Sequence, residues 1–569
     1  MKHNLGEESA GARLLFAPML VVACFVAFFP ALGAGFSDFD DVGFLIETQF
    51  WRGLSLSNIV EMFTTMRLGH YQPLTYLSHA IEYTLFGLNP AVFHFTNIAL
   101  HAKNPDLVAW LVAMLWALNP MRVESVAWIT ERRDVLSAAF LLAATLMYLK
   151  HAATAQWTRA YVICIIALTL SLFSKAWGIT FVAVALFLDI MLLKRLPANP
   201  TRWNNTDARR ILLEKAPFAL LSVIFGFFAS RAVLEAGPGS VRDLSTWGIG
   251  DRLNQAIYGL GFYASHALIT FEHAALRELP RSISITELRV IVPAVMSSGI
   301  AIGLFALAHR QHERARLISL ALLLFMVLVS PVLGLTQAGV QLVAERYSYL
   351  STIPLLVLLA PLLSKAIDRN RTAALIGTLM FCCVCGVLSH RQSRTWGDTL
   401  ALWEQSLSSG EDGPILRNFY ARQLEQREKF TLAAAEYRKS LEFDPNYGDS
   451  WFGLANALRG SGDHIGAINA SKQAAAFATD TVPVNIGEGL SYVALARYDE
   501  AIRSFQTACD ELERRGNPLA IGRPYLLTAA AYGESGREDL ALEWLHKASQ
   551  FPDTRAEAER LIVELRNLK

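Results

Sequence analysis

Residues 14–35 read LLFAPMLVVACFVAFFPALGAG and run directly into FSDFDD at residues 36–41. The first segment carries no charge and is long enough to cross a bilayer as a helix. No small-residue cleavage site precedes the next polar stretch, so we expect a retained membrane span rather than a signal peptide. The second segment places three carboxylates at the membrane surface, immediately after that span.

The remainder of the chain divides into an apolar part and a polar part. Of its 569 residues, 53% are hydrophobic and only 18% are charged, whereas about a quarter are charged in a typical soluble protein. Long apolar runs continue to residue 388, and charged residues recur every few positions from residue 391. We therefore expect a membrane domain at 1–390, a linker at 391–415 and a soluble domain at 416–569. The net charge of +1 gives no reason to expect a nucleic-acid partner.

The apolar runs predict an all-α, polytopic bundle of about eleven spans. These are residues 14–35, 90–101, 106–117, 135–149, 160–173, 179–193, 216–233, 290–308, 317–335, 350–363 and 373–388. Basic residues gather in the links 194–215, 309–316 and 365–371, which places those links in the cytoplasm. They share one side only if residues 253–271 do not fully cross, so we interpret that stretch as re-entrant or interfacial. An odd number of spans then places the C-terminal domain outside the cytoplasm.

The soluble domain contains a repeat with a small residue at a fixed point. FTLA, HIGA, YDEA and EDLA place alanines at Ala433, Ala467, Ala501 and Ala541. The first two spacings equal the 34-residue period of the tetratricopeptide repeat, a pair of helices that stacks into a solenoid. The sequence therefore predicts about four repeats. Their concave face would bind a protein partner, although a purely structural array is an equally good interpretation.

The carboxylates Asp38, Asp40 and Asp41 are candidates for acid–base chemistry. An acceptor hydroxyl that attacks an activated sugar must lose a proton, and a positioned carboxylate can accept it. The alternative is a solvated acidic loop with no catalytic role.

Other polar residues stand in the predicted external links. His79 lies in the first of these, and the segment 119–134 alternates Glu124, Glu131 and Asp134 with Arg122, Arg132 and Arg133. Arginine offers paired donors to phosphate oxygens, but interfacial salt bridges explain the same mixture. Glu345 and Arg346 begin a late span, where Arg346 is placed to meet a lipid phosphate. Lys175 is a further candidate, although lysines at span ends commonly snorkel without a ligand.

Taken in order, these motifs resemble a known family. FDD at 39–41, QPLT at 72–75, LFGLNP at 85–90, VESVAW at 123–128, ER at 131–132 and ERY at 345–347 are similar to the transmembrane and tetratricopeptide-repeat-containing proteins. That family resembles GT-C glycosyltransferases related to protein O-mannosyltransferases. The resemblance implies a GT-C-like bundle that moves a sugar, expected to be mannose, from a polyprenyl-phosphate to a hydroxyl of a protein acceptor captured by the repeats.

The resemblance also implies roles for individual residues. Asp40 would be the catalytic base with Asp41 assisting, and Arg346 and Arg132 would bind the donor phosphate. Glu124, His79 and Glu345 would support them. No metal site is expected, and no cofactor can be named beyond the lipid-linked sugar. A bacterial inner membrane with periplasmic repeats fits the short, cysteine-poor loops, and an endoplasmic-reticulum placement would have the same topology.

Two segments depart from the family pattern. Asn119-Pro120 stands where His-Pro is usual, and residues 272–280 replace a stretch rich in proline and tyrosine. The alternative of a different class is a non-catalytic membrane scaffold whose repeats recruit protein partners. The intact pair Asp40 and Asp41 argues against that alternative.

Overall fold

The computed structural model describes residues 10–37, 39–67, 69–101, 107–154, 158–235, 242–308, 312–335, 339–477, 480–514 and 522–567. Over these ranges the chain is almost entirely helical, with one two-stranded antiparallel sheet. The contacts divide it into two compact units, Met1–Ser409 and Gly410–Lys569. The predicted linker 391–415 is itself largely helical, and the division falls inside it.

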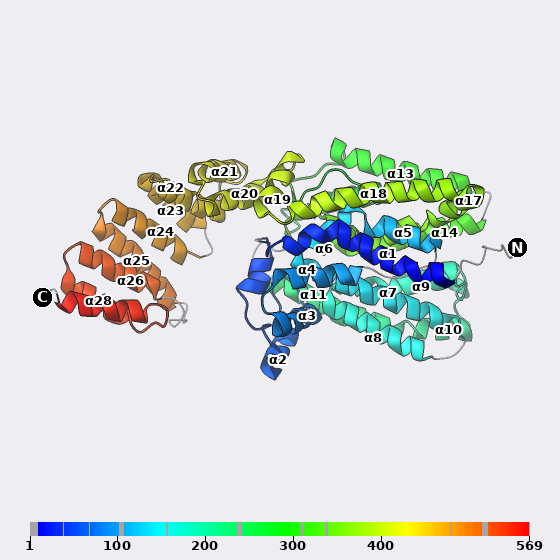
Figure 1. Cartoon of the computed structure of the whole chain (residues 1–569), viewed down its shortest axis with the longest axis horizontal. Helices are drawn as coiled ribbons and strands as arrows, with labels where there is room; N and C mark the ends of the chain where they lie inside the picture. The colour runs from blue at the N-terminus through cyan, green and yellow to red at the C-terminus, as the bar shows by residue number, and fades with distance from the viewer. Residues whose placement is uncertain are drawn as a thin grey trace. The chain divides into compact units, whose positions relative to one another are not determined.

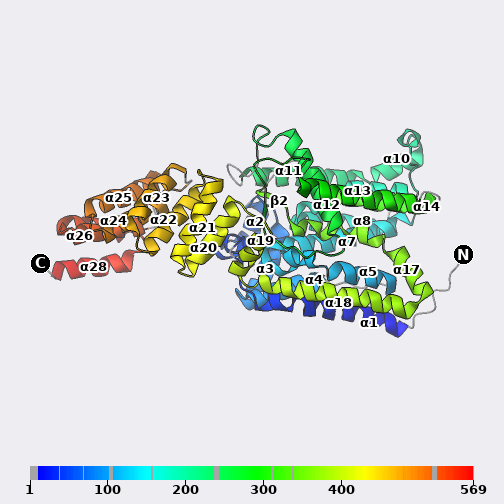
Figure 2. The same cartoon turned by 90° about the horizontal axis from the view of Figure 1, so that it is seen from above.

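The first unit is a helical bundle whose elements appear in Figures 1 and 2. Helix α7 packs most extensively against α8, and α18 lies along α1. Strands β1 and β2 pair across the links that follow α12 and α14. The helices and strands of this unit are α1 (Ala10–Phe28), α2 (Leu56–Thr64), α3 (Pro73–Phe86), α4 (Pro90–His101), α5 (Leu107–Ala117), α6 (Val123–Ala127), α7 (Arg132–Ala152), α8 (Arg159–Ser174), α9 (Phe181–Phe187), α10 (Thr206–Leu213), α11 (Ala216–Glu235), α12 (Ile249–Ser265), β1 (Arg277–Glu278), α13 (Leu288–Ala308), α14 (His312–Val329), β2 (Gln341–Val343), α15 (Ser348–Ser351), α16 (Ile353–Val357), α17 (Ala360–Arg369), α18 (Arg371–Thr395) and α19 (Thr399–Ser408).

Four helical segments of the described chain are long and apolar enough to cross a membrane. They are Ile129–Ala152, Thr206–Glu235, Glu313–Val332 and Arg371–Thr395. Two bent pairs raise the number to six if each pair is one span: Leu107–Ala117 with Pro120–Ala127, bent by 64°, and Glu345–Ser351 with Ile353–Arg369, bent by 52°. These helices indicate a membrane protein, but the expected count of eleven spans is not confirmed.

The expected eleven spans exceed the observed four to six because some of the helices are short and others are broken. Several predicted spans are shorter apolar helices, among them Arg159–Ser174. Its 16 residues rise only about 24 Å, against about 30 Å for a bilayer core. Helix α4 buries His94, Asn97 and His101 and belongs to neither apolar group. Within residues 253–271, α12 ends at Ser265 and its apolar face packs on α13.

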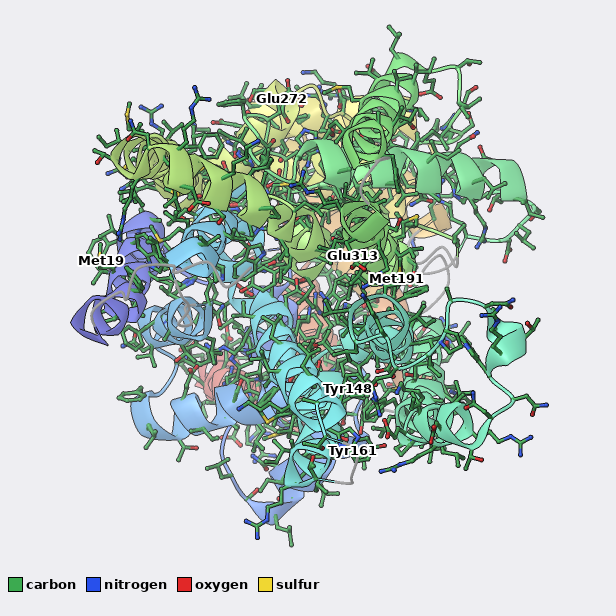
Figure 3. The ribbon with its side chains drawn as sticks, turned by 90° about the vertical axis from the view of Figure 1, so that its right-hand side faces the viewer. Met19, Tyr148, Tyr161, Met191, Glu272 and Glu313 are labelled. Atoms are coloured by element: carbon green, nitrogen blue, oxygen red, sulfur yellow. The ribbon has the colours of Figure 1, made fainter. Side chains whose placement is uncertain are left out.

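The basic link after α9 is tied down by buried ion pairs. Arg195 bonds to Glu214 at 2.7 Å and to Asp189 at 3.1 Å, and Lys215 bonds to Asp189 at 2.6 Å. Tyr148, labelled in Figure 3, also donates to Asp189. The link 194–215 holds six basic residues, which were used above to place it in the cytoplasm. Two of them, Arg195 and Lys215, are therefore neutralised inside the bundle.

The second unit consists of helix pairs, α20 with α21, α22 with α23, α24 with α25 and α26 with α27, followed by α28 on α27. Helices α21, α23, α25 and α27 begin at the first residue of FTLA, HIGA, YDEA and EDLA, and all four alanines of these motifs are buried. The predicted repeats are thus confirmed, while residues 515–521, between α25 and α26, lie outside the described residues. The helices are α20 (Pro414–Gln426), α21 (Phe430–Phe443), α22 (Gly448–Gly460), α23 (His464–Phe477), α24 (Val482–Ala494), α25 (Tyr498–Arg514), α26 (Arg523–Glu534), α27 (Glu538–Ala548) and α28 (Arg555–Asn567).

Two helical glycines of this unit give a matched test of the packing. A Cβ on Gly453 would lie 2.2 Å from the Tyr437 ring, whereas a Cβ on Gly533 meets nothing within 4 Å. We expect Gly453→Ala to lower the free energy of unfolding of the repeat unit by about 1–3 kcal/mol through overpacking. Gly533→Ala should leave it unchanged or raise it slightly, because alanine favours a helix. Pulse proteolysis of the full chain in urea measures both, and equal effects would contradict the close approach.

Candidate active site

The loop after the first helix is fixed by Asp41. Its carboxylate is buried and accepts hydrogen bonds from the Ser37 amide at 2.8 Å, from the Thr130 amide at 2.9 Å and from the Thr130 hydroxyl. Burial raises the pKa of Asp41 to about 6, although these hydrogen bonds favour its ionised form. The carboxylate therefore anchors residues 37–41 to the turn that carries Glu131.

Asp40 is held by this anchor and is differently placed. It is half-buried, and its carboxylate receives no hydrogen bond from any described residue. Burial raises the pKa of Asp40 above its ordinary value of 3.8, and the nearby charges of Arg133, Arg346 and Lys175 oppose this only in part. Asp40 is thus an unengaged carboxylate of increased basicity facing three cations. The third carboxylate of the cluster, Asp38, lies outside the described residues.

Glu131 is the centre of the cation cluster. Its carboxylate accepts from Arg133 at 2.5 Å, from Lys175 at 3.0 Å and from Arg346 at 3.3 Å. It is fully buried in the short helix Ile129–Glu131. Two segments distant in sequence, at Lys175 and Arg346, therefore converge on the segment that carries Glu131 and Arg133.

Two further carboxylates complete the cluster. Glu124 accepts from both the backbone amide and the guanidinium of Arg346. Asp134 accepts from Lys175 at 2.6 Å and from the Trp177 indole at 2.7 Å. Three cations thus face three carboxylates, and Asp40 stands beside a formally balanced set.

The cations retain donors that these carboxylates do not use. Nη1 of Arg133 is buried and has no hydrogen-bond partner within the described structure. Nη2 of Arg346 donates to no described residue, and Lys175 uses two of its three ammonium hydrogens. Unused charged donors beside an unengaged carboxylate are an arrangement that can hold an anion next to a base.

Arg132 and His79 lie elsewhere. Arg132 donates to Asn97, to Glu82 and to the Phe93 carbonyl, at 2.8, 2.5 and 2.5 Å respectively. His79 is buried against the Phe93 ring, with ring centroids 5.2 Å apart. Successive helical residues point about 100° apart, so Arg133 faces the cluster while Arg132 joins α7 to α3 and α4. Of these two arginines, Arg133 is the one that lies in the cluster with Glu131.

Glu345 belongs to a neighbouring network built from an unusual segment. It accepts from His273 at 2.9 Å, from Arg277 at 3.3 Å and from the Ala274 amide. Asn119 donates to the carbonyl of Ala267, six residues before His273. Both departures from the family pattern therefore lie in or next to the segment that contacts Glu345. Glu345 in turn holds the segment that carries Arg346.

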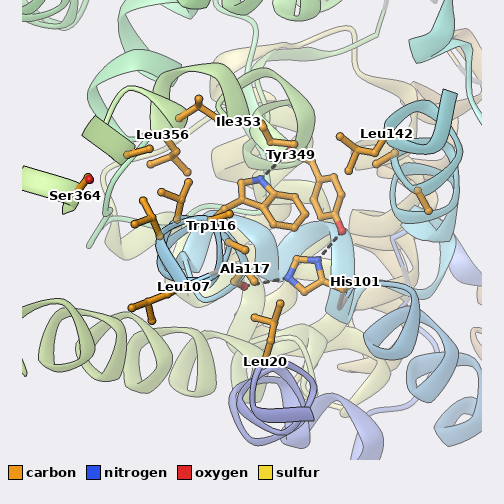
Figure 4. Close-up of a pocket in the computed structure, with 18 of the residues that line it drawn as sticks. Leu20, His101, Leu107, Trp116, Ala117, Leu142, Tyr349, Ile353, Leu356 and Ser364 are labelled. Atoms are coloured by element: carbon orange, nitrogen blue, oxygen red, sulfur yellow. Dashed lines mark hydrogen bonds between the residues drawn. The ribbon is translucent and has the colours of Figure 1, made fainter. Parts of the chain in front are cut away.

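An apolar cavity of about 820 Å³ has in its wall Val135 and Tyr349, which are close in sequence to Asp134 and Arg346. Its lining comes chiefly from α5, from α7 beyond Val135 and from α16 and α17, as Figure 4 shows. At one end Tyr349 donates to His101 at 2.6 Å, and His101 bonds to the Ala117 carbonyl at 3.0 Å. Because a carbonyl only accepts, Nε2 of His101 carries the hydrogen and Nδ1 accepts from Tyr349. Asp368, near the end of α17, and Arg371, the first residue of α18, also line the cavity.

Comparison with known proteins identifies the repeat and a set of relatives. A family model described as tetratricopeptide repeat matches residues 436–469. The protein O-mannosyl-transferase tmtc2 of Xenopus laevis is 29% identical over 146 residues, and a protein O-mannosyl-transferase of Caenorhabditis elegans is 22% identical over 433 residues. The resemblance to the transmembrane and tetratricopeptide-repeat-containing proteins is confirmed.

The extent of these matches differs. The Xenopus match covers 23% of this chain and 18% of the relative, and the nematode match covers 71% and 57% respectively. The crystal structure of the MamA protein aligns over 29% of this chain with a TM-score of 0.26 and 19% identity. Within the described residues, no group of three or more His, Cys, Asp or Glu side chains is arranged to hold a metal ion.

The two members of the acidic pair should respond differently to amidation. Asp41→Asn puts an amide donor opposite the Ser37 amide or the Thr130 amide, and an unsatisfied buried group costs about 1–3 kcal/mol. We expect a clear fall in the thermal unfolding midpoint of the detergent-solubilised protein. Asp40→Asn breaks no described hydrogen bond, so its midpoint should stay at or above that of the wild type. A larger fall for Asp40→Asn than for Asp41→Asn would contradict these roles.

Proposed function

We propose that this chain is a membrane glycosyltransferase that moves a sugar from a polyprenyl-phosphate carrier to a hydroxyl of a protein acceptor. The observation that carries the proposal is the unengaged Asp40 carboxylate beside the unused donors of Arg133, Arg346 and Lys175. The names of the relatives in Xenopus and Caenorhabditis support mannose as the sugar and a protein as the acceptor.

The residues divide the reaction between base and leaving-group stabilisation. Asp40 accepts the proton of the acceptor hydroxyl as the oxygen attacks the anomeric carbon. The bond from that carbon to the phosphate oxygen breaks, and negative charge grows on the lipid phosphate. Arg346, Arg133 and Lys175 stabilise that charge through donors already oriented by Glu131. Asp41 keeps Asp40 in place, and Glu124 and Glu345 orient Arg346.

The apolar cavity gives the carrier a place to lie. Its wall includes Val135 and Ala138, on the helix that carries Arg133 in its first turn, and Tyr349, three residues after Arg346. A lipid chain in the cavity therefore has its phosphate end close to the cations. The cavity wall is mostly apolar. It would therefore stabilise the bound lipid chain by removing that chain from water and lipid contact rather than through hydrogen bonds.

The location and the partner follow from the same proposal. The acidic loop and the repeats lie on the extracytoplasmic side, which is the periplasm if the membrane is a bacterial inner membrane. The acceptor therefore arrives from the aqueous phase. The repeats, as protein-binding modules, capture that acceptor. A single chain then joins a lipid-phase donor to a soluble acceptor.

The decisive variant is Asp40→Asn, assayed for sugar transfer from a radiolabelled polyprenyl-phosphate-mannose to membrane protein. General-base catalysis contributes about 10²- to 10⁴-fold, so we expect transfer to fall by that range at unchanged expression. Asp243→Asn, an exposed aspartate in the link before α12, is the matched control and should retain wild-type transfer. Undiminished transfer by Asp40→Asn would remove Asp40 from the mechanism. Wild-type protein that neither transfers nor binds the donor would favour a membrane scaffold instead.

The pH dependence follows from the sign of the Asp40 shift. Only the ionised carboxylate accepts a proton, so transfer should be constant at high pH and fall as pH drops through the Asp40 pKa. Because burial raises that pKa, the fall should be centred above 3.8. A pH–rate profile under saturating donor measures it. If the residual activity of Asp40→Asn showed the same fall at low pH, the titrating group would be a residue other than Asp40.

A further inference from the structure

Four aromatic side chains form a continuous cluster over the Asp40 loop. Phe39 stacks on Trp128 with ring centroids 4.9 Å apart, and Trp403 meets the edge of Phe39 at 5.3 Å. Trp396 stacks on Trp128 at 5.5 Å. Both Trp128 and Trp403 are almost completely buried, at 1% exposure. We call Trp403, Phe39, Trp128 and Trp396 the aromatic cluster.

The aromatic cluster touches both halves of the site. Phe39 is the backbone neighbour of Asp40, so its ring position restricts the direction of the Asp40 side chain. Trp128 lies under the Arg346 guanidinium, with Cζ 5.2 Å from the ring centroid. A cation over a tryptophan face is attracted to it, more strongly when both are buried. One stack of rings therefore fixes the separation of the base candidate and the cation that faces it.

Helix α19 supplies the outer part of this stack and makes a second connection to the site. Trp403 and Ser406 lie on the same face of α19, three residues apart. The Ser406 hydroxyl accepts from the Ala275 amide at 3.0 Å, and the adjacent Ala274 amide donates to Glu345. Helix α19 is thus connected to Asp40 through Phe39 and to Arg346 through Glu345.

These contacts bring together segments that the sequence separates widely. Residues 36–41, 123–134 and 272–278 contact Trp403, Trp396 and Ser406 respectively, in the short stretch of chain that precedes the repeat unit beginning at Gly410. A shift of α19 changes the position of Phe39 and of the segment 272–278 at once. The chain that leads to the repeats is therefore also part of the wall that shapes the site.

We propose that Trp403, acting through Phe39 and Trp128, is a positioning residue that sets the geometry between Asp40 and Arg346. The proposal rests on the transferase function proposed above, because it assigns the two positioned groups to one reaction. Trp403 acts here through the Phe39 ring, so its removal should impair the reaction step and leave donor capture largely intact. A misplacement of about 1 Å at a reacting centre can cost about 10²-fold in rate.

The test compares Trp403→Ala with two variants of the full chain. Trp403→Phe retains a ring against Phe39, and Leu402→Ala removes an equally buried apolar side chain from the same helix. We expect Trp403→Ala to lower kcat by about ten- to a hundredfold with little change in the KM for the lipid donor. Trp403→Phe should restore most of kcat, and Leu402→Ala should lower stability without this loss.

Hydrogen exchange supplies a readout that needs no activity. Trp403→Ala should speed amide exchange in peptides covering residues 36–41 and 344–349, and Leu402→Ala should not. If wild-type protein transfers no sugar, the proposed function fails, while the exchange result still decides whether Trp403 holds these segments. Exchange and kcat that change equally in Trp403→Ala and Leu402→Ala, or that do not change in Trp403→Ala, would overturn the positioning role.

Discussion

The ion cluster around Glu131 is the constraint on which the site depends. Arg133, two residues along the chain, and the distant Lys175 and Arg346 all bond to this one buried carboxylate. A buried carboxylate without partners would be strongly destabilising, so the helices that carry these cations must stay together. The residue before Glu131, Thr130, also anchors Asp41 and through it the loop of Asp40. Fold and candidate chemistry therefore share one set of contacts: the carboxylates orient the cations and leave some of their donors unused.

The sequence predicted the repeats accurately because their signal is local. A small residue at a 34-residue period marks where two helices of one pair approach, and the helices begin where those motifs begin. The all-helical character of the first unit was equally accessible from composition. The span count was not, because apolar length alone does not tell where a helix bends or how short it ends. The polar residues of α4 and the breaks before α6 and α16 depend on tertiary partners that no local window contains.

The site was accessible in part, for a geometric reason. Motif order drew attention to Asp40, Asp41, Glu124 and Arg346, and the structure brings these four into one region. Motif order could not show which of Arg132 and Arg133 lies in the cluster, because adjacent helical residues face different neighbours. Nor could it show that His273 and Arg277 brace Glu345, because that segment is 68 residues or more away in sequence. One departure from the family pattern, the segment 272–280, supplies these contacts to Glu345, and the other, Asn119, bonds to Ala267 shortly before that segment.

The central claim is that the donors left unused by Glu131, Glu124 and Asp134 receive a lipid phosphate. The most direct measurement is the dissociation constant of polyprenyl phosphate, without sugar, for the purified protein in nanodiscs and for its Arg346→Gln variant. We expect this variant, which loses the charge and the guanidinium donors, to bind about tenfold or more weakly, because a charge-assisted contact is worth about 1.5–3 kcal/mol. The same substitution at the exposed Arg289 should have no effect. Equal affinity of the wild type and Arg346→Gln for the phosphate would contradict the account.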